Sequence, residues 1–566
     1  MEKKQKQLPL RQMKEAIRNI NPLALQDVSS LQSTLVLLLN VVEEQSDQID
    51  KLKQEVKDLK DEINRLKKEQ GVPVFPPKKD KSSEESNGSK GGGKRTGKRG
   101  NWNKGSKKPK IPIDRVEICV LDKSDLPRDA RLKYYEEVRQ QDVKLVRENV
   151  LYKVAVYYSP SLGKTYRGKM PEGYVGEFGL NLRGLTQVFH HYCDMTRGKI
   201  AGLYKSLGVL ISTGTINNFL INQTDWAIEE QREILRRGIA GSPYTQMDST
   251  KSVERGERKA TQMICGEYFS VFYTMDNKSR LEVLRALLGK PTAGLQVAYN
   301  EQSISLLAHF GVSQADRLSL SHLFQEEQVL SLADFRNQMQ QAAPVIAAKK
   351  NMFARITESM ALGYYHSQEE FPVVQHLLTD DAPEYKKIAA EQQGLCWVHD
   401  NRHYKKLIPK IQVHHDILEQ VQQEYWTFYG QLLDYKEATK AEQLLLKPIL
   451  TVEFDRIFSQ HTNYFQVNTR LESTFKNKSK LLAVLDNPAL PLHNNAAELE
   501  ARRVVRKRDI SLHTWSSKGT EVKDAFMSIV QTAARLDIPV LEYIKDRISQ
   551  RYDMPSLANL VQLAYA

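Results

Sequence analysis

Apolar residues between positions 35 and 66 recur at alternating spacings of three and four residues, which is typical of a coiled coil. The stripe consists of Leu35, Leu38, Val42, Gln45, Ile49, Leu52, Val56, Leu59, Ile63 and Leu66, and only Gln45 is polar. β-Branched residues at the a positions and leucines at the d positions favour a parallel two-stranded coiled coil. The alternative is an amphipathic helix that packs on its own chain. We predict an N-terminal helical region at residues 1–71 that makes the protein a homodimer or a higher oligomer.

Alternation with a period of two predicts strands in two regions. The segments VEICVLD and ENVLYKVAVYYSP predict a small β-rich unit at residues 111–175. YTQMDST and ATQMICGEYFSVFYTMD predict three strands, and VVQHLLTDDAP and GLCWVHDNR predict two more, each followed by a helix. Strands that alternate with helices in this way predict an α/β domain with a mixed sheet at residues 231–510. Amphipathic patterns predict helical insertions at about 295–370 and 405–485, and a C-terminal helical domain at 511–566.

A pair of short helices is predicted within residues 176–230. The stretch RGKIAGLYKSLGVLISTGTINNFLINQ indicates a helix, a turn at Gly208 and a second helix whose N-cap is Ser212 or Thr213. This is the helix-turn-helix pattern. Its second helix would place three polar side chains toward a DNA groove, Thr215, Asn217 and Asn218. Helix pairs are also common without any DNA-binding role.

Charge is concentrated in one segment of the chain. Lys and Arg total 82 against 69 Asp and Glu, a formal charge of +13. The segment from Lys78 to Lys110 holds 12 basic and 3 acidic residues, a net of +9. A Gly/Ser/Lys segment of this kind cannot bury enough apolar surface to fold alone, so residues 72–110 are predicted to be a disordered basic linker. It is either a solvated spacer or an arm that binds DNA phosphates, with Lys94, Arg95, Lys98 and Arg99 as the candidate contacts.

The remaining composition excludes several protein classes. No two of the four Cys lie closer than 70 residues, which excludes a disulfide framework and a CxxC zinc knuckle and suits a reducing cytosol. The longest apolar run, LVLLL, is far shorter than the roughly 20 residues of a membrane span. The N-terminus lacks the apolar core of a secretory signal. We expect a cytoplasmic protein with no membrane partner.

Three carboxylates occupy positions where α/β proteins place their sites. Asp248 is predicted to end one strand, Asp380 to end another, and Glu498 to begin a helix after NPALPLHNNAAE. Carboxylates at the ends of adjacent strands converge on one edge of a sheet. Three hard oxygen ligands suit Mg²⁺ or Mn²⁺, and two such ions support phosphoryl transfer. Asp381 and Glu500, beside two of these residues in sequence, are expected to point elsewhere.

Each carboxylate also has a structural alternative. Asp248 and Ser249 can form a turn. Asp380 or Asp381 can cap the helix that Pro383 starts. Glu498 lies three residues after Asn495, the spacing of a capping box, and four before Arg502, within reach of a salt bridge.

Two further groups lie near these carboxylates in sequence. Cys396, His399 and His403 in CWVHDNRH resemble zinc ligands, but no fourth ligand is evident, so Cys396 is interpreted as a buried strand residue. The basic run RRVVRKR at 502–508 is by default a solvated helix face. Because it follows Glu498 directly, it is well placed to bind DNA phosphates, with Arg502 and Arg503 first.

The strings around the carboxylates resemble the DDE transposases of the insertion-sequence 66 family. LPLHNNAAELEARRVV is similar to the family's signature before its catalytic Glu, and LLTDDAPEY with GLCWVHDNRHY is similar to the segment of its second Asp. SIVQTAARLDIPVLEYIKDRI and GVLISTGTINNFL resemble its C-terminal helices and its helix-turn-helix. The resemblance covers roughly residues 175–550. It implies an RNase H-like fold with Asp248, Asp380 and Glu498 as the catalytic and metal-binding triad, and His399 and Arg402 as further DNA contacts.

The chain departs from the family pattern in three respects. The first Asp stands in DST, where the family more often has Asp-Glu-Thr. The spacing from Asp248 to Asp380, 132 residues, is longer than usual, so residues 295–370 are interpreted as an insertion. The family's zinc module lacks its cysteines here, so no zinc is expected.

The resemblance implies a transposase that cleaves DNA at the ends of its own element and joins the freed 3′-OH to target DNA, with two Mg²⁺ or Mn²⁺ ions. DNA and accessory transposition proteins would be its partners in the nucleoid of a prokaryotic cytoplasm. One alternative is a catalytically inactive DNA-binding dimer with a regulatory or DNA-organising role. Another is a metal-dependent nuclease outside transposition.

Overall fold

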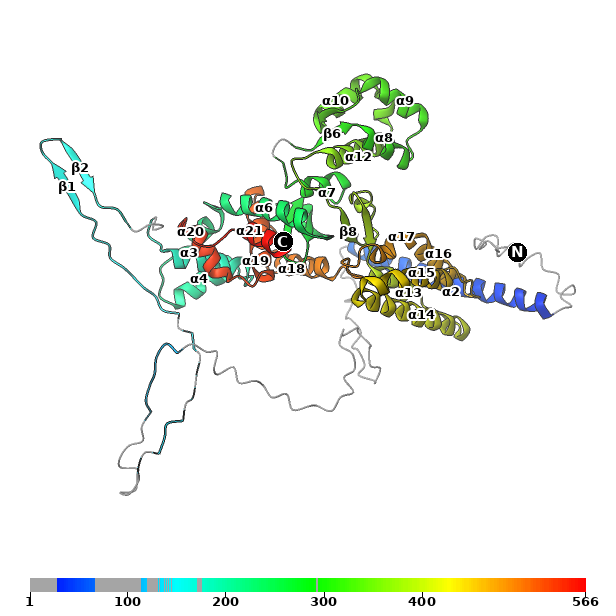
Figure 1. The fold of residues 1–566 in the computed structure, drawn as a ribbon, viewed down its shortest axis with the longest axis horizontal. Coiled ribbons are helices and arrows are strands. Elements are labelled where there is room, and N and C mark those ends of the chain that lie inside the picture. Colours follow the sequence, from blue (N-terminus) through cyan, green and yellow to red (C-terminus); the bar gives the residue numbers. More distant parts are fainter. Residues whose placement is uncertain are drawn as a thin grey trace. The chain divides into compact units, whose positions relative to one another are not determined.

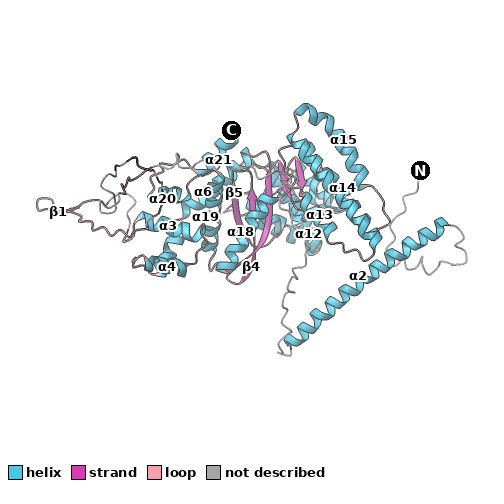
Figure 2. Ribbon diagram, turned by 90° about the horizontal axis from the view of Figure 1, so that it is seen from below, coloured by secondary structure: helices cyan, strands magenta, loops and turns pink. Residues whose placement is uncertain are grey.

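The computed structural model describes residues 28–66, 113–119, 145–170, 176–291 and 294–566, with scattered positions between 131 and 143. The chain forms two compact units, one from Met1–Lys53 with Tyr152–Ala566 and one from Gln54–Leu151. The linker candidates Lys94, Arg95, Lys98 and Arg99 lie outside the described residues. Helices predominate in the structure (Figure 2). Among the described residues, no helix combines the length and the apolar character that a membrane crossing requires.

The helix α2, Val28–Leu66, lies within the region predicted to be helical, and residues 1–27 and 67–71 of that region lie outside the described residues. One of its faces packs on its own chain, where Asn40 and Glu43 are buried. Asn40 donates a hydrogen bond to the Asn463 carbonyl at 2.7 Å, and Glu43 accepts one from the Lys410 backbone N–H. The predicted seam lies on another face and is exposed at Leu35, Leu38, Val42, Ile49, Leu52, Val56 and Leu59. The helix therefore packs on its own chain without using its apolar stripe.

Only part of the β-rich unit predicted at residues 111–175 lies among the described residues. Its described part contains one hairpin, β1 Val156–Ser159 and β2 Lys164–Arg167, while residues 113–119 and 145–155 form no strand. Val116, Ile118 and Leu151 are exposed. An alternating segment becomes a stable strand only when a partner strand and a core cover one face, and the described residues supply neither to 113–119 and 145–155.

A five-stranded mixed sheet forms the centre of the α/β region, as predicted. Its order is β5-β4-β3-β8-β9. β3 pairs antiparallel with β4 and parallel with β8, and β8 pairs parallel with β9. The strands are β3 Thr245–Glu254, β4 Glu257–Cys265, β5 Ser270–Met275, β8 His376–Thr379 and β9 Gln392–Leu395.

Helices cover both faces of this sheet and one of its edges. One face shares a large apolar core with α6 Asp225–Gly241, α7 Arg280–Leu287, α20 Val540–Ser549 and α21 Leu557–Tyr565. The other face packs through Met263 and Phe272 against Val504 of α18, Asn495–Ser511. The helices after residue 511 therefore share the core of the sheet.

The helix α19, Ser517–Arg535, lies along the edge strand β5 (Figure 2). Asp524, Ser528 and Thr532, spaced four residues apart on α19, accept hydrogen bonds from the backbone N–H groups of Thr274, Phe272 and Ser270. An uncovered edge strand would leave these donors free to pair with another chain. The side chains of α19 take the place of a sixth strand.

The predicted helical insertions are present, with one addition. The first contains α8 Glu301–His309, α9 Gln314–Leu323, α10 Leu332–Ala342, α11 Pro344–Ala348 and α12 Lys350–Ser367 (Figure 1). It also contains an unpredicted two-stranded sheet, β6 Gln296–Tyr299 with β7 Gln328–Ser331. The second comprises α13 Trp397–Lys405, α14 Gln412–Glu437, α15 Lys440–Phe458, α16 Phe465–Lys476 and α17 Lys478–Leu481, around a core that includes Trp397.

Three helices precede the sheet, α3 Leu180–His191, α4 Arg197–Ser206 and α5 Thr213–Ile221. The two at the predicted helix-turn-helix are α4 and α5, and Gly208 in the turn has a positive φ of 74°. The Ser212 hydroxyl accepts a hydrogen bond from the Thr215 N–H at 3.0 Å, which makes Ser212 the N-cap. A small core of Ile200, Tyr204, Ile216 and Leu220 holds the pair together. A DNA-binding role for this pair stays a prediction.

Candidate active site

The first two carboxylates lie on adjacent parallel strands. Thr245 and Gln246 of β3 are in register with Leu377 and Leu378 of β8. The same offset brings Asp248 level with Asp380, which follows β8 directly. In a parallel pair, residues level with each other project from the same face, so the two side chains lie on one side of the sheet.

The sequence pattern predicted that Asp248 ends its strand, and this prediction is wrong. β3 continues to Glu254, because β4 pairs with it residue by residue from Gln246↔Cys265 to Glu254↔Glu257. Asp248 is thus held within a paired strand. This excludes the turn with Ser249, although the Ser249 N–H does donate to Asp248 Oδ1 at 2.7 Å.

Asn494 connects the helix of Glu498 to the two strand regions. Its side-chain amide donates to the Met247 carbonyl at 2.8 Å, and its backbone N–H donates to Cys396 Sγ at 3.3 Å. Asn494 is fully buried and is the N-cap residue of α18, although its side chain makes no capping bond. The capping box of Asn495 and Glu498 is therefore absent, and Glu498 in the first turn is free for other partners.

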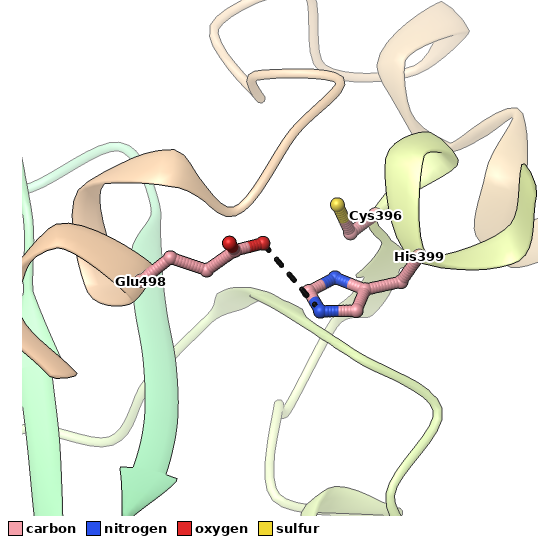
Figure 3. A group of neighbouring side chains, drawn as sticks. All are labelled: Cys396, His399 and Glu498. Carbon is pink, nitrogen blue, oxygen red and sulfur yellow. Dashed lines mark ion pairs between the residues drawn. The ribbon is translucent and has the colours of Figure 1, made fainter. Parts of the chain in front are cut away.

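The carboxylate of Glu498 is turned toward basic side chains from two helices. Arg402 of α13 lies 3.1 Å from it, His399 Nε2 lies 3.5 Å away, and Arg502 one turn along α18 lies 3.9 Å away. Figure 3 shows His399 and Cys396 from one side and Glu498 from the other, directed toward a common space. The salt bridge with Arg502 exists, but Arg402 is the nearer partner.

Burial and charge change the proton affinity of these groups. Burial raises the pKa of Asp248 to about 6, and the neighbouring charges of Asp380 and Glu498 act in the same direction. Burial and the charge of Arg402 lower the pKa of His399, so its imidazole is neutral at pH 7. Asp380 accepts a hydrogen bond from the Ala382 N–H at 3.2 Å, just before the short 3₁₀ helix Pro383–Tyr385. Asp380 thus has part of the structural role weighed for it.

An open cavity of about 400 Å³ lies over Asp248 and Glu498, whereas Asp380 is not part of its lining. Its lining consists of Asp248, His399, Arg402, Glu498, Ala501, Arg502, Val505 and Arg506. Arg506 was not singled out from the sequence, although it stands in the basic run after Glu498. Carboxylates in a cavity rimmed by arginines can hold divalent cations and a phosphodiester together.

The other predicted DNA contacts are not brought to this cavity. Arg503 Nε lies 3.2 Å from the buried carboxylate of Glu500, which occupies part of its hydrogen-bonding capacity. Asn217 on α5 accepts a hydrogen bond from Arg197 at 2.7 Å, Asn218 is exposed, and Thr215 lies in the same helix. These residues stay predictions for DNA binding.

Two sets of metal ligands meet at Glu498. Among the described residues, the donor atoms of Cys396, His399 and Glu498 all lie within 4.8 Å of one another. Glu498 is thus a third donor that the sequence did not reveal beside Cys396. Burial raises the pKa of the Cys396 thiol, which disfavours the thiolate that zinc prefers. The oxygen donors of Asp248, Asp380 and Glu498 fit Mg²⁺ or Mn²⁺ better, and the absence of zinc stays a prediction.

Replacing Asn494 with alanine tests whether it positions Glu498. The change removes the donor to the buried Met247 carbonyl, so the free energy of unfolding should fall by about 1–3 kcal/mol. DNA cleavage by the folded protein should fall as well, because the start of α18 is no longer tied to β3. Urea unfolding and a cleavage assay measure the two effects. Asn495→Ala, at the exposed neighbouring position, is the control, and equal effects of both variants would contradict the role of Asn494.

The fold is an α/β core that carries three carboxylates at one site. Asp248 lies on β3, Asp380 directly follows the adjacent parallel strand β8, and Glu498 lies on α18, whose N-cap residue is hydrogen-bonded to β3. Residues 365–522 match the model of the transposase IS66 family. This confirms the family resemblance found in the sequence, and residues 365–522 are a transposase IS66 family domain. The match includes Asp380 and Glu498 but not Asp248, whose placement rests on its register with Asp380.

Two further comparisons bear on the chain. The uncharacterized protein y4jO of Sinorhizobium fredii (strain NBRC 101917 / NGR234) is 26% identical over 343 residues, which are 59% of this chain and 99% of the relative. No solved structure matches the chain. The description of the relative assigns it no activity, so this similarity supports kinship alone.

Proposed function

We propose that the protein is a transposase that cleaves DNA at the ends of a mobile element and joins the freed ends to target DNA. The observation that carries the proposal is the placement of Asp248 and Asp380 level with each other on parallel strands. Glu498 is held beside them through Asn494, within or next to a transposase IS66 family domain. DNA is the proposed partner, and accessory transposition proteins are compatible with it.

Asp248, Asp380 and Glu498 would hold two Mg²⁺ or Mn²⁺ ions. When bound, such ions lower the proton affinity of an attacking oxygen and stabilise the charge on the leaving oxygen. Arg402, Arg502 and Arg506 on the cavity rim would bind the phosphates on either side of the cleaved bond. Arg402 now pairs with Glu498. Its guanidinium could pair with a DNA phosphate instead, which would leave the carboxylate to the metal ions.

Two in-line displacements make up the reaction. In the first, water attacks the phosphodiester at the element's end, and the 3′ oxygen leaves as the 3′-OH. In the second, this 3′-OH attacks a target phosphodiester, forms a new P–O bond and releases the 3′-OH of the target strand. No covalent bond to the protein is needed in either step.

An in vitro assay with the DNA that flanks the gene, searched first for terminal inverted repeats, tests the proposal. Mg²⁺-dependent cleavage at the repeat ends, followed by joining to a plasmid, is the expected result. Cleavage without joining would identify a nuclease outside transposition. Tight binding of the repeats without cleavage would identify a regulatory or DNA-organising protein.

Metal binding should depend on pH through Asp248. Since burial raises its pKa to about 6, Asp248 is protonated below that pH and an ion must displace the proton. Affinity for Mn²⁺ should therefore rise with pH up to about 6, by at most tenfold per pH unit for one released proton, and then level off. Calorimetric titration with Mn²⁺ at a series of pH values measures this affinity. Affinity that is constant across this range would show that Asp248 is not a ligand.

A further inference from the structure

A second cavity of about 310 Å³ lies beside the five-stranded sheet, away from the carboxylates. It is enclosed by α4 and α5, the C-terminal half of α18, and the loop that leads from α18 to α19. Its volume is near the lower end of the roughly 300–1,000 Å³ of small-molecule pockets, so it can take one nucleotide-sized group and not a duplex. The residues that matter to its chemistry are His191, Arg197, Lys507, Arg508, Trp515 and Lys523.

An exposed tryptophan stands on a fixed loop at this cavity. Trp515 is 71% exposed, and its ring centroid lies 4.4 Å from that of His513. The backbone beneath it is held to the end of β3, because Arg255 donates to the Thr514 carbonyl at 2.9 Å and to the Trp515 carbonyl at 3.0 Å. A large aromatic face that is held in place and left open to solvent is suited to stacking on a planar ligand.

The cavity is also strongly basic. Arg197, Lys507, Arg508 and Lys523 line it, and no acidic residue does so among the described residues of its wall. Lys507 is almost fully buried and donates to the His190 carbonyl. Lys507, Arg508 and Lys523 each have an acidic ion-pair partner outside the wall, Asp194, Asp509 and Asp524 at 3.4, 3.7 and 3.2 Å, so the lining itself presents only basic charge. Aromatic and cationic side chains together are the combination with which proteins bind single-stranded nucleic acid.

A buried polar side chain in the wall has no partner. His191 is 5% exposed and stacks on Phe526, with 4.7 Å between ring centroids. Neither ring nitrogen has a hydrogen-bond partner among the described residues. Burial holds the pKa of His191 well below its ordinary value, so the neutral ring offers one donor and one acceptor. A buried group of this kind is costly unless a ligand or water satisfies it.

The cavity lies at a defined distance from the carboxylates. Along α18, Glu498 and Arg508 are separated by about 15 Å at 1.5 Å per residue. Along β3, Asp248 and Ser252 of the cavity wall are separated by about 13 Å at 3.3 Å per residue. Since successive phosphates of one strand are about 3.4 Å apart along a DNA helix, this corresponds to roughly four nucleotides.

We propose that this cavity receives one unstacked nucleobase of a DNA strand, about four nucleotides from the bond at the carboxylates. The base stacks on Trp515, and the phosphates beside it are held by Arg197, Arg508 and Lys523. A base anchored there fixes the register of the strand in the active site. The base site rests on the proposed function only in taking DNA as the ligand, and its distance to the cleaved bond rests also on the carboxylates being the place of cleavage.

Binding of short single-stranded DNA by the full-length protein without metal tests the proposal. The probes are a labelled oligothymidylate and an oligomer of the same length made of abasic sites, and fluorescence anisotropy gives the affinities. The wild type should bind the oligothymidylate roughly 5- to 150-fold more tightly, the range expected for one stacked base. Trp515→Ala should lose this preference and bind the abasic oligomer as the wild type does. Trp515→Phe should keep most of the preference, and Trp426→Ala, which removes a partly exposed Trp on α14, should keep all of it.

Three results would overturn the inference. The first is equal affinity of the wild type for both probes. The second is a Trp515→Ala variant whose affinity falls equally for both probes, and the third is a preference for the oligothymidylate that survives Trp515→Ala. The last would place the stacking elsewhere, with Trp102 of the linker as the first candidate. As a second measurement, irradiation of an oligonucleotide carrying 5-iodouracil should crosslink to the peptide that contains Trp515. Base preference without metal-dependent cleavage would support this inference and overturn the proposed function. Metal-dependent cleavage without base preference would support the proposed function and overturn this inference.

Discussion

Alanine at Asp248, Asp380 or Glu498 should reduce strand cleavage by about a thousandfold or more, because loss of a single charge-stabilising group already costs about 100- to 1,000-fold. Binding of the element's ends should change little, since these side chains are proposed to hold metal ions and not the duplex. A gel assay of cleavage and an anisotropy measurement of end binding separate the two effects.

Matched controls for these variants come from the same elements. Asp381 is about half exposed and lies 3.7 Å from Lys480, and Asp509 on α18 is largely exposed, so alanine at either should leave cleavage nearly unchanged. Glu500 points away from the cavity, as expected, but it is unsuitable as a control. It is buried and lies 3.0 Å from Arg535, and breaking a buried ion pair costs about 3–5 kcal/mol. Its loss would lower activity through unfolding.

Two outcomes would change the assignment of the triad. Activity in Asp380→Ala together with inactivity in Asp381→Ala would move the second ligand by one position. Normal cleavage by Glu498→Ala would show that Glu498 serves only as the ion-pair partner of Arg402 and that the proposed triad is wrong.

Lysine at both Leu52 and Leu59 should convert the full-length protein from a dimer or higher oligomer to a smaller species. Both residues lie at d positions, and charges buried in the seam of a coiled coil have no partner there. Sedimentation velocity over a range of concentrations measures the change. Gln54→Lys, at an outer position of the same helix, should leave the assembly intact. A wild-type protein that is monomeric at all concentrations would contradict the coiled coil.

The contacts of α2 with its own chain support the proposed seam. Asn40 and Glu43, which are buried, lie at f and b positions, as does Asp50, 3.0 Å from Lys410. These positions are opposite to a and d on a helix, so the stripe at Leu52 and Val56 is left exposed. The helix can therefore bind its own chain on one face and a partner helix on the other. Packing on its own chain is observed on one face of the helix, and the coiled coil on the other face stays a prediction.

The sequence predicted much of the fold where the signal is local. The helix pair around Gly208, the long helices of the second insertion and the strands before Asp380 and Cys396 lie where the patterns place them. Residues 113–119 and 145–155 form no strand although their alternation predicts one, and the pairing of β6 with β7 was not predicted. In both cases the outcome depends on whether a partner strand and a core cover the segment, which a period of two does not reveal.

The candidate site was predicted in its residues but not in its geometry. The strings LLTDDAPEY and LPLHNNAAE predicted Asp380 and Glu498 as site residues. The contacts of Asn494, the ion pair of Arg402 with Glu498 and the cavity beside Trp515 were not predicted. Asn494 stands in one of those strings, but its function consists of two contacts with residues 98 and 247 positions away.

By itself, the sequence determined the helical periods, the apolar stripe at residues 35–66, the concentration of basic charge between Lys78 and Lys110 and the family of residues 365–522, because each depends on neighbouring residues or on a continuous motif. Only the tertiary structure decided that Asp248 is level with Asp380, that Glu498 meets His399 and Arg402, and that α19 covers the edge of β5. These contacts join segments about 100 to 250 residues apart. Parallel pairing and edge protection are settled by burial in a shared core, and no local pattern states which distant segment will supply the partner.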